Sequence, residues 1–270
     1  MPVLIVFRRE VGQYLTSPFA YVIAAATLLL TGVLFNRDLA VSMGTKAAEP
    51  SLVPTVLSFT MVFFAPLLTM RLFAEERREG TLELLLTAPV SDTSIVIGKF
   101  LGAWFYFTLL LALTFLYQFI LLAITVPDIG HAVSAYIGIW LYGGATLAVG
   151  ILFSALTENQ IVAAFLSMVT LILLWLGDQA GDLIANIDIA RFVRTLSLQG
   201  HFSTSFAAGL LRAEDAAFFT GVIAVALFIT IRIVQIEPVA LMRRGNDHVG
   251  TSGRLPALSA RRRCWSACWA

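Results

Sequence analysis

FLGAWFYFTLLLALTFLYQFILLAITV, residues 100–126, decides the fold class, because this stretch carries no charged side chain. About 20 consecutive apolar residues in a helix are enough to cross the roughly 30 Å hydrocarbon layer of a membrane. A longer apolar run spans that layer with tilt or projects beyond it. The stretch therefore predicts a transmembrane helix.

Other apolar runs of the same kind lie at residues 19–35, 52–70, 133–156, 161–177 and 216–234. The chain is 59% hydrophobic and 13% charged, whereas a soluble domain is about 25% charged. Because a segment in lipid must satisfy its own backbone hydrogen bonds, these continuous runs are expected to be helices. We expect an all-α integral membrane protein, with six transmembrane helices in one domain, residues 19–235, and the lipid bilayer as its surroundings.

The distribution of Lys and Arg predicts the orientation. With the N-terminus in the cytoplasm, thirteen of the 18 Lys and Arg residues fall on the cytoplasmic side, as the positive-inside rule requires. Both termini are then cytoplasmic. Arg8 and Arg9 precede the first run, as in a signal peptide, but the run is longer than a signal core and no A-x-A cleavage site follows. We expect an uncleaved anchor.

Three segments flank or interrupt the spans. Residues 1–18 combine a broad apolar face with charged residues, which favours an amphipathic helix in the membrane interface over a flexible lead-in. Residues 178–215 are too polar to span and too apolar for a free linker, so short amphipathic helices at the outer face are expected. Residues 236–270 are expected to form a disordered cytoplasmic tail. Cys264 and Cys268 in that tail have no nearby His, so no metal site is expected.

The longest charged segment between spans on the expected cytoplasmic side is EERREGTLELLLTAPVSDTSIVIGK, residues 75–99. Gly80 interrupts the helix that leaves the second span, Thr81 can cap a new one, and Pro89 ends it. That short helix has one charge, Glu83, among the leucines Leu82, Leu84, Leu85 and Leu86. The spacing alone leaves two interpretations open, a helix that docks onto a soluble partner and a re-entrant turn that packs on the chain's own helices.

This segment resembles the cytoplasmic loop of type-2 ABC transporter permeases. The residues that carry the resemblance are Glu76-Arg77-x-x-Gly80-Thr81-Leu82-Glu83-x-Leu85-Leu86-x-x-Pro89-Val90-Ser91, followed by Gly98-Lys99. A second stretch is similar to the outer segment of the gliding-motility and nitrous-oxide-reductase-maturation branch of these permeases. It consists of Leu196-Ser197-x-x-Gly200-His201-Phe202, Phe206, Gly209-Leu210-Leu211 and Asp215.

The resemblance implies that membrane transport and ATP hydrolysis are carried out by separate subunits. Two permease chains, identical or similar, would pair with two separate ABC ATPase subunits in the bacterial inner membrane and export a substrate. Residues 81–88 would be the coupling helix that the ATPase moves. Glu76 and Arg77 would hold the extension of the second span to the interfacial helix. His201, Phe202, Gly209 and Asp215 would belong to the outer segment.

The chain lacks the phosphate-binding motif G-x-x-x-x-G-K-[ST]. We therefore expect no ATPase activity and no cofactor on this chain, with ATP bound by the partner subunit. A net charge of +1 gives no reason to expect nucleic acid as a partner. The substrate does not follow from the sequence.

Other functions remain open as alternatives. A non-transporting scaffold could use the same loop to transmit ATP-driven motion to an outer partner. An ion-coupled carrier would need ionisable or ion-binding groups at mid-membrane, which the spans almost lack. Gln118 in the third span is expected to form a helix–helix hydrogen bond, and His201 to be an interfacial histidine. Gly143, Gly144 and Gly150 predict a close contact or a bend in the fourth span.

Overall fold

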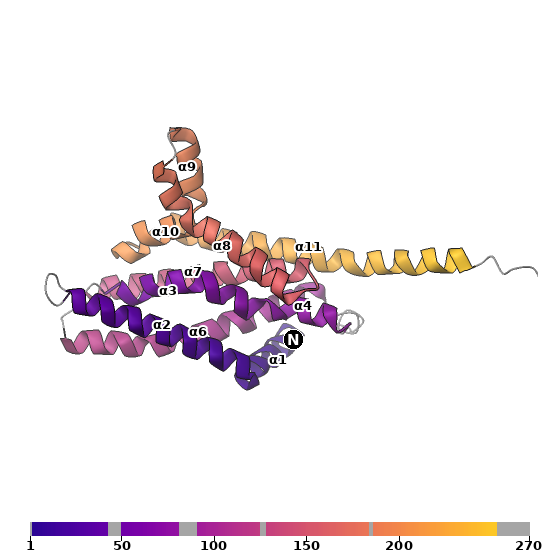
Figure 1. Ribbon diagram of the computed structural model, residues 1–270, viewed down its shortest axis with the longest axis horizontal. Coiled ribbons are helices and arrows are strands. Elements are labelled where there is room, and N and C mark those ends of the chain that lie inside the picture. The colour runs from indigo at the N-terminus through magenta and orange to yellow at the C-terminus, as the bar shows by residue number, and fades with distance from the viewer. Residues whose placement is uncertain (1, 43–49, 81–90, 125–127, 184–185, 253–270) are drawn as a thin grey trace, which may run out of the picture. The chain divides into compact units, whose positions relative to one another are not determined.

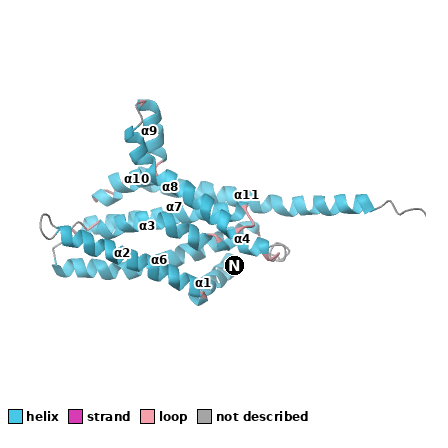
Figure 2. Ribbon diagram, in the orientation of Figure 1, coloured by secondary structure: helices cyan, strands magenta, loops and turns pink. Residues whose placement is uncertain are grey.

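The computed structural model describes residues 2–42, 50–80, 91–124, 128–183 and 186–252, and in these ranges every regular element is a helix (Figures 1 and 2). Their bounds are α1 (Pro2–Thr16), α2 (Pro18–Ser42), α3 (Leu52–Thr69), α4 (Arg71–Arg78), α6 (Asp92–Ile124), α7 (Ile129–Leu156), α8 (Gln160–Leu183), α9 (Ile187–Leu196), α10 (Leu198–Thr204), the 3₁₀ helix η1 (Phe206–Ala208) and α11 (Ala213–Ser252).

Within the described residues, six helical stretches are long and apolar enough to cross a membrane. They are Pro18–Val41, Leu52–Arg78, Asp92–Leu121, Ile129–Leu156, Gln160–Gly181 and Ala213–Ile236. The all-α integral membrane fold is therefore confirmed. Each stretch contains one of the predicted apolar runs almost completely, because a run without charges has no reason to end inside the hydrocarbon layer.

The chain divides into two units, Met1–Val234 and Gln235–Ala270. In the first unit, α7 is the most buried of the spanning helices and contacts α3, α6 and α8. Glycines allow this close packing, since a Cβ at Gly143 would overlap the Phe107 ring and one at Gly150 would overlap Thr69 Oγ1. The predicted close contact of the fourth span is confirmed.

The second unit differs from the expected disordered tail. Helix α11 continues to Ser252, so residues 236–252 are helical, while residues 253–270 lie outside the described part of the chain. Pro238 removes one backbone donor but does not stop the helix here. The residues after it, ALMRR at positions 240–244, are strong helix formers.

Candidate functional site

The amphipathic helix α1 packs closely on the start of α6. A Cβ at Gly98 would lie 2.7 Å from Val6 Cβ, and a Cβ at Gly102 would lie 2.7 Å from Glu10 Cβ. Real side chains do not approach so closely, so only glycine fits at these two positions. The Gly98-x-x-x-Gly102 pair therefore allows α1 to pack closely on α6. This packing places Glu10 against the surface of α6.

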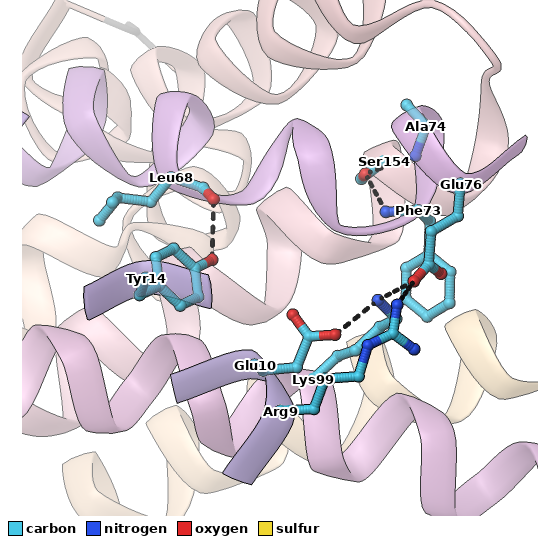
Figure 3. Close-up of polar contacts among 9 residues, drawn as sticks. All are labelled: Arg9, Glu10, Tyr14, Leu68, Phe73, Ala74, Glu76, Lys99 and Ser154. Atoms are coloured by element: carbon cyan, nitrogen blue, oxygen red, sulfur yellow. Dashed lines mark hydrogen bonds and ion pairs between the residues drawn. The ribbon is translucent and has the colours of Figure 1, made fainter. Parts of the chain in front are cut away.

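Lys99 lies between two carboxylates contributed by other helices (Figure 3). Its Nζ is 2.9 Å from Glu10 Oε1 on α1 and 2.9 Å from Glu76 Oε1 on α4. Arg9 Nη2, on the more exposed side of the group, is 3.7 Å from the same Glu76 oxygen. We call Arg9, Glu10, Glu76 and Lys99 the ion cluster. It joins α1, α4 and α6 at one point.

The ion cluster is largely removed from water, since Lys99 is 1% exposed and Glu10 is 2% exposed. An ammonium group in such surroundings is tolerated only when opposite charges and hydrogen bonds compensate for its lost hydration. Two carboxylates supply that compensation, and the face of Phe73, 5.3 Å from Nζ, adds a cation–π contact. The three helices are thus held together by a group whose disruption is costly.

Tyr14 provides a second connection from α1. Its hydroxyl donates to the Leu68 carbonyl of α3 at 2.9 Å (Figure 3). Its ring stacks on Tyr106 of α6 with 5.0 Å between the ring centroids. Burial, assisted by the nearby Glu10 carboxylate, raises the pKa of the Tyr14 phenol far above its usual value. The phenol therefore stays protonated and remains a donor at physiological pH.

Ser154 of α7 is inserted where α3 passes into α4. Its Oγ accepts hydrogen bonds from the backbone N–H groups of Phe73 and Ala74, at 3.1 and 3.2 Å (Figure 3). The same hydroxyl donates to the Met70 carbonyl at 3.0 Å. A side chain inserted into the i→i−4 ladder is a common cause of a helix bend. The inserted Ser154 side chain explains why the second span and its extension form two helices, α3 and α4, that meet at Met70. The same side chain connects this junction to α7.

Helix α4 leads directly to the segment expected to couple to an ATPase. It ends at Arg78, and Gly80 follows with φ +69°, a left-handed conformation that suits glycine at the end of a helix. The expected coupling residues Thr81, Leu82, Glu83, Leu84, Leu85, Leu86 and Pro89 lie outside the described residues. The structure therefore describes the base from which that segment departs.

Of the loop residues expected from the sequence, Glu76 belongs to the ion cluster, and Arg77 lies beside it in the last turn of α4. Sequence reasoning missed Lys99 and Glu10 as its central pair. The two are 89 positions apart. The available signal was a lysine at the start of the third span, flanked by Gly98 and Gly102, together with a glutamate on the amphipathic helix before the first span.

The four residues expected in the outer segment are not part of the ion cluster, and two of them, His201 and Asp215, contact each other. His201 Nδ1 is 2.6 Å from Asp215 Oδ1 of α11, and its Nε2 is 3.0 Å from the Thr195 carbonyl. Phe202 is fully buried, with its ring centroid 5.9 Å from that of Tyr142 on α7. Gly209 has φ +80° and closes the turn after η1. These contacts fasten the segment between α8 and α11, and in the described residues no cluster of three or more His, Cys, Asp or Glu could hold a metal ion.

The comparison with protein families decides what kind of protein carries this arrangement. The model of the ABC-2 family transporter protein matches residues 18–177, which include α2, α3, α4, the segment 81–90, α6, α7 and most of α8. The chain belongs to the ABC-2 transporter family. Among curated proteins, none matches this chain.

As an ABC-2 family member, the chain is a membrane permease subunit of a transporter. The match concerns the family as a whole, so the resemblance to the gliding-motility and nitrous-oxide-reductase-maturation branch stays a prediction. The matched region contains Lys99 and two of its contacts, Glu76 and Phe73. The α1 partners, Arg9 and Glu10, precede it.

Proposed function

We propose that this chain is the permease half of an ATP-driven exporter in a bacterial inner membrane, and that it pairs with a second permease chain and with separate ABC ATPase subunits. The observation that carries this proposal is the buried ion cluster, which joins α1, α4 and α6 directly beside the departure point of residues 81–90. A subunit that receives force from a partner needs such a rigid base where the force enters.

The contacts of α4 give the proposal a mechanical basis. Helix α4 ends at Arg78, shortly before residues 81–90 in the sequence. Along its length it is held to α1 and α6 by Lys99 and to α7 by Ser154. A displacement applied beyond Gly80 would therefore move these helices together. Because α7 is the most buried spanning helix, the motion would reach the centre of the permease.

Co-purification tests the docking of the ATPase. The chain is expressed with an ABC ATPase from the same genome neighbourhood, and Leu85→Asp is expected to abolish their association because it places a charge on an apolar docking helix. Leu211→Asp serves as the control, since Leu211 is exposed and lies in the segment between η1 and α11. If Leu85→Asp binds the ATPase as well as the parent chain does, the docking proposal is wrong.

A second candidate function is a non-transporting scaffold that passes ATP-driven motion to an outer partner. Helix α9 favours it, because Ile187, Phe192 and Leu196 are 74%, 68% and 53% exposed and offer an apolar surface. Reconstitution with the ATPase in vesicles distinguishes the two functions. ATP-dependent movement of a solute or lipid supports the exporter, whereas ATP-dependent conformational change with nothing moved supports the scaffold.

A further inference from the structure

A pocket of about 330 Å³ lies between α1 and α4, next to the start of α2. Tyr14 and Leu68 line it together with the ion cluster, so two of the contacts drawn in Figure 3 border this space. Phe19 of α2 and Leu72 of α4 add apolar walls. Sites for small ligands combine apolar walls with a few polar groups in this way. A lining that is both charged and apolar suits an amphiphilic molecule.

Three charged side chains of this pocket lie on one stripe of α4 and lack an ionic partner. Arg71 and Glu75 are one helical turn apart, and Glu79 follows after another turn at the C-cap. The ion cluster pairs its own charges, whereas no ion pair or side-chain hydrogen bond forms at these three residues within the described part of the chain. The Arg71 guanidinium is held over the Phe19 ring, 4.2 Å from its centroid.

The order of these charges follows the path of the chain out of the membrane. Residues 52–70 carry no charge, and Arg71 is the first charged residue after them. Glu75 and Glu79 lie roughly 6 and 12 Å further along the helix, at about 1.5 Å per residue. The cation is therefore nearest to the hydrocarbon layer, and the two carboxylates lie on its polar side.

A phospholipid with a primary amine in its headgroup carries the complementary order of charges. Its phosphate lies next to the acyl chains, and in phosphatidylethanolamine an ammonium group follows two carbon atoms further out. That ammonium donates hydrogen bonds as a lysine side chain does, and such charge-assisted bonds to carboxylates are strong. Phosphatidylglycerol has no cation for the carboxylates, and the methyl groups of phosphatidylcholine leave no N–H to donate. The charge order therefore selects one class of lipid.

We propose that this pocket binds the headgroup of phosphatidylethanolamine. The phosphate binds Arg71, the ammonium binds the carboxylates of Glu75 and Glu79, and the acyl chains leave beside Phe19 and Leu68. The bound lipid adds a contact between α1 and α4 beside the ion cluster. The site concerns binding to this chain alone and does not depend on the proposed ATPase.

Native mass spectrometry of the full chain in a neutral detergent tests the site. The protein is mixed with equal amounts of the palmitoyl-oleoyl forms of phosphatidylethanolamine, phosphatidylcholine and phosphatidylglycerol, which differ only in their headgroups. The parent chain is expected to retain phosphatidylethanolamine about threefold to tenfold over either competitor. This is the range that one or two partly exposed ion pairs give.

Two variants separate the ammonium contact from the phosphate contact. Glu75→Gln combined with Glu79→Gln should lose the preference for phosphatidylethanolamine, because the carboxylates that bind its ammonium are gone. Arg71→Gln should lower the total amount of all three lipids that is retained, because their shared phosphate loses its cation.

Each variant has a matched control outside the pocket. Arg78→Gln removes an exposed arginine from the same helix, and Glu158→Gln removes an exposed glutamate from the turn between α7 and α8. Neither residue lines the pocket, so both controls should retain lipids as the parent chain does. All these side chains lie outside the hydrophobic core, so the variants are expected to fold.

Equal retention of the three lipids by the parent chain would overturn the proposal, since charges that only face water select no lipid. A preference of the parent chain for phosphatidylglycerol would overturn it as well, because Arg71 would then act without the carboxylates. So would an unchanged preference in the double glutamine variant, or equal retention by Arg71→Gln and Arg78→Gln. None of these results depends on whether Leu85→Asp affects ATPase binding, so the two proposals fail separately.

Discussion

At the scale of single residues, Lys99 decides how the interfacial helix is attached to the permease. It is the only basic side chain among the described residues that is at most 1% exposed, and its two partners come from α1 and α4. Its role could not be read from the sequence, because the sequence shows a lysine at the end of a charged loop. Only the close approach of α1, allowed by Gly98 and Gly102, brings Glu10 to it.

Replacing Lys99 by Met is expected to destabilise the protein by about 3–5 kcal/mol, because the buried Glu10 then loses its cation and Glu76 keeps only the exposed Arg9. Arg9→Met is the matched control, since the Arg9 side chain is 51% exposed and its pair with Glu76 is worth less than about 1 kcal/mol. Unfolding in mixed detergent, followed by far-UV circular dichroism, measures both variants. Equal effects of the two substitutions would contradict the assignment of Lys99 as the central cation.

Ser154→Ala is expected to cost about 1–3 kcal/mol, because the hydroxyl that joins Met70, Phe73 and Ala74 to α7 is lost. Ser167→Ala is the control. Ser167 is equally buried, but its hydroxyl bonds only to the Ala164 carbonyl of its own helix. The same unfolding measurement should show little change for Ser167→Ala, and a similar loss for both would argue against a special role of Ser154.

At the scale of elements, the sequence predicts the spanning helices well and their ends less well. The charge-free runs locate each span, but α6 begins at Asp92, eight positions before the apolar run at residue 100. The sequence does favour this start, since Ser91 or Asp92 can cap the helix that leads into the third span. The ion cluster then makes burial of Lys99 within that helix possible. Conversely, the second span is divided at Met70 by Ser154, a contact between residues 84 positions apart that no local pattern contains.

The packing of α1 on α6 gives a prediction about helices as units. Gly98→Ala is expected to weaken it, because the added methyl group would meet Val6 Cβ at 2.7 Å and push the two helices apart. Gly12→Ala is the contrast, since Gly12 lies within α1 with nothing within 4 Å of the new methyl group. It should stabilise the helix by about 0.5–1 kcal/mol.

Thermal unfolding of both glycine variants, together with proteolysis of α1, measures this difference. Gly98→Ala should release α1 for cleavage at lower temperature than the parent chain, and Gly12→Ala should not. Similar behaviour of the two variants would mean that α1 is not held by its contact with α6.

At the scale of the whole molecule, family membership establishes a permease subunit, and the contacts around α4 suggest where a partner acts on it. The candidate site divides into two parts for a physical reason. The loop residues recognised from the sequence are those that we propose to meet another protein, and they form a local sequence motif. The residues that hold the loop's base come from α1, α6 and α7, and only folding brings them together.

The central claim is that residues 81–90 face the cytoplasm and meet a separate ATPase. Its most direct test is labelling of Leu85→Cys, in a chain whose Cys264 and Cys268 are replaced by Ser, with a membrane-impermeant maleimide. The account predicts labelling in inside-out vesicles but not in right-side-out vesicles, and protection from the label when the ATPase is co-expressed. Labelling from the outer side of the membrane would contradict it.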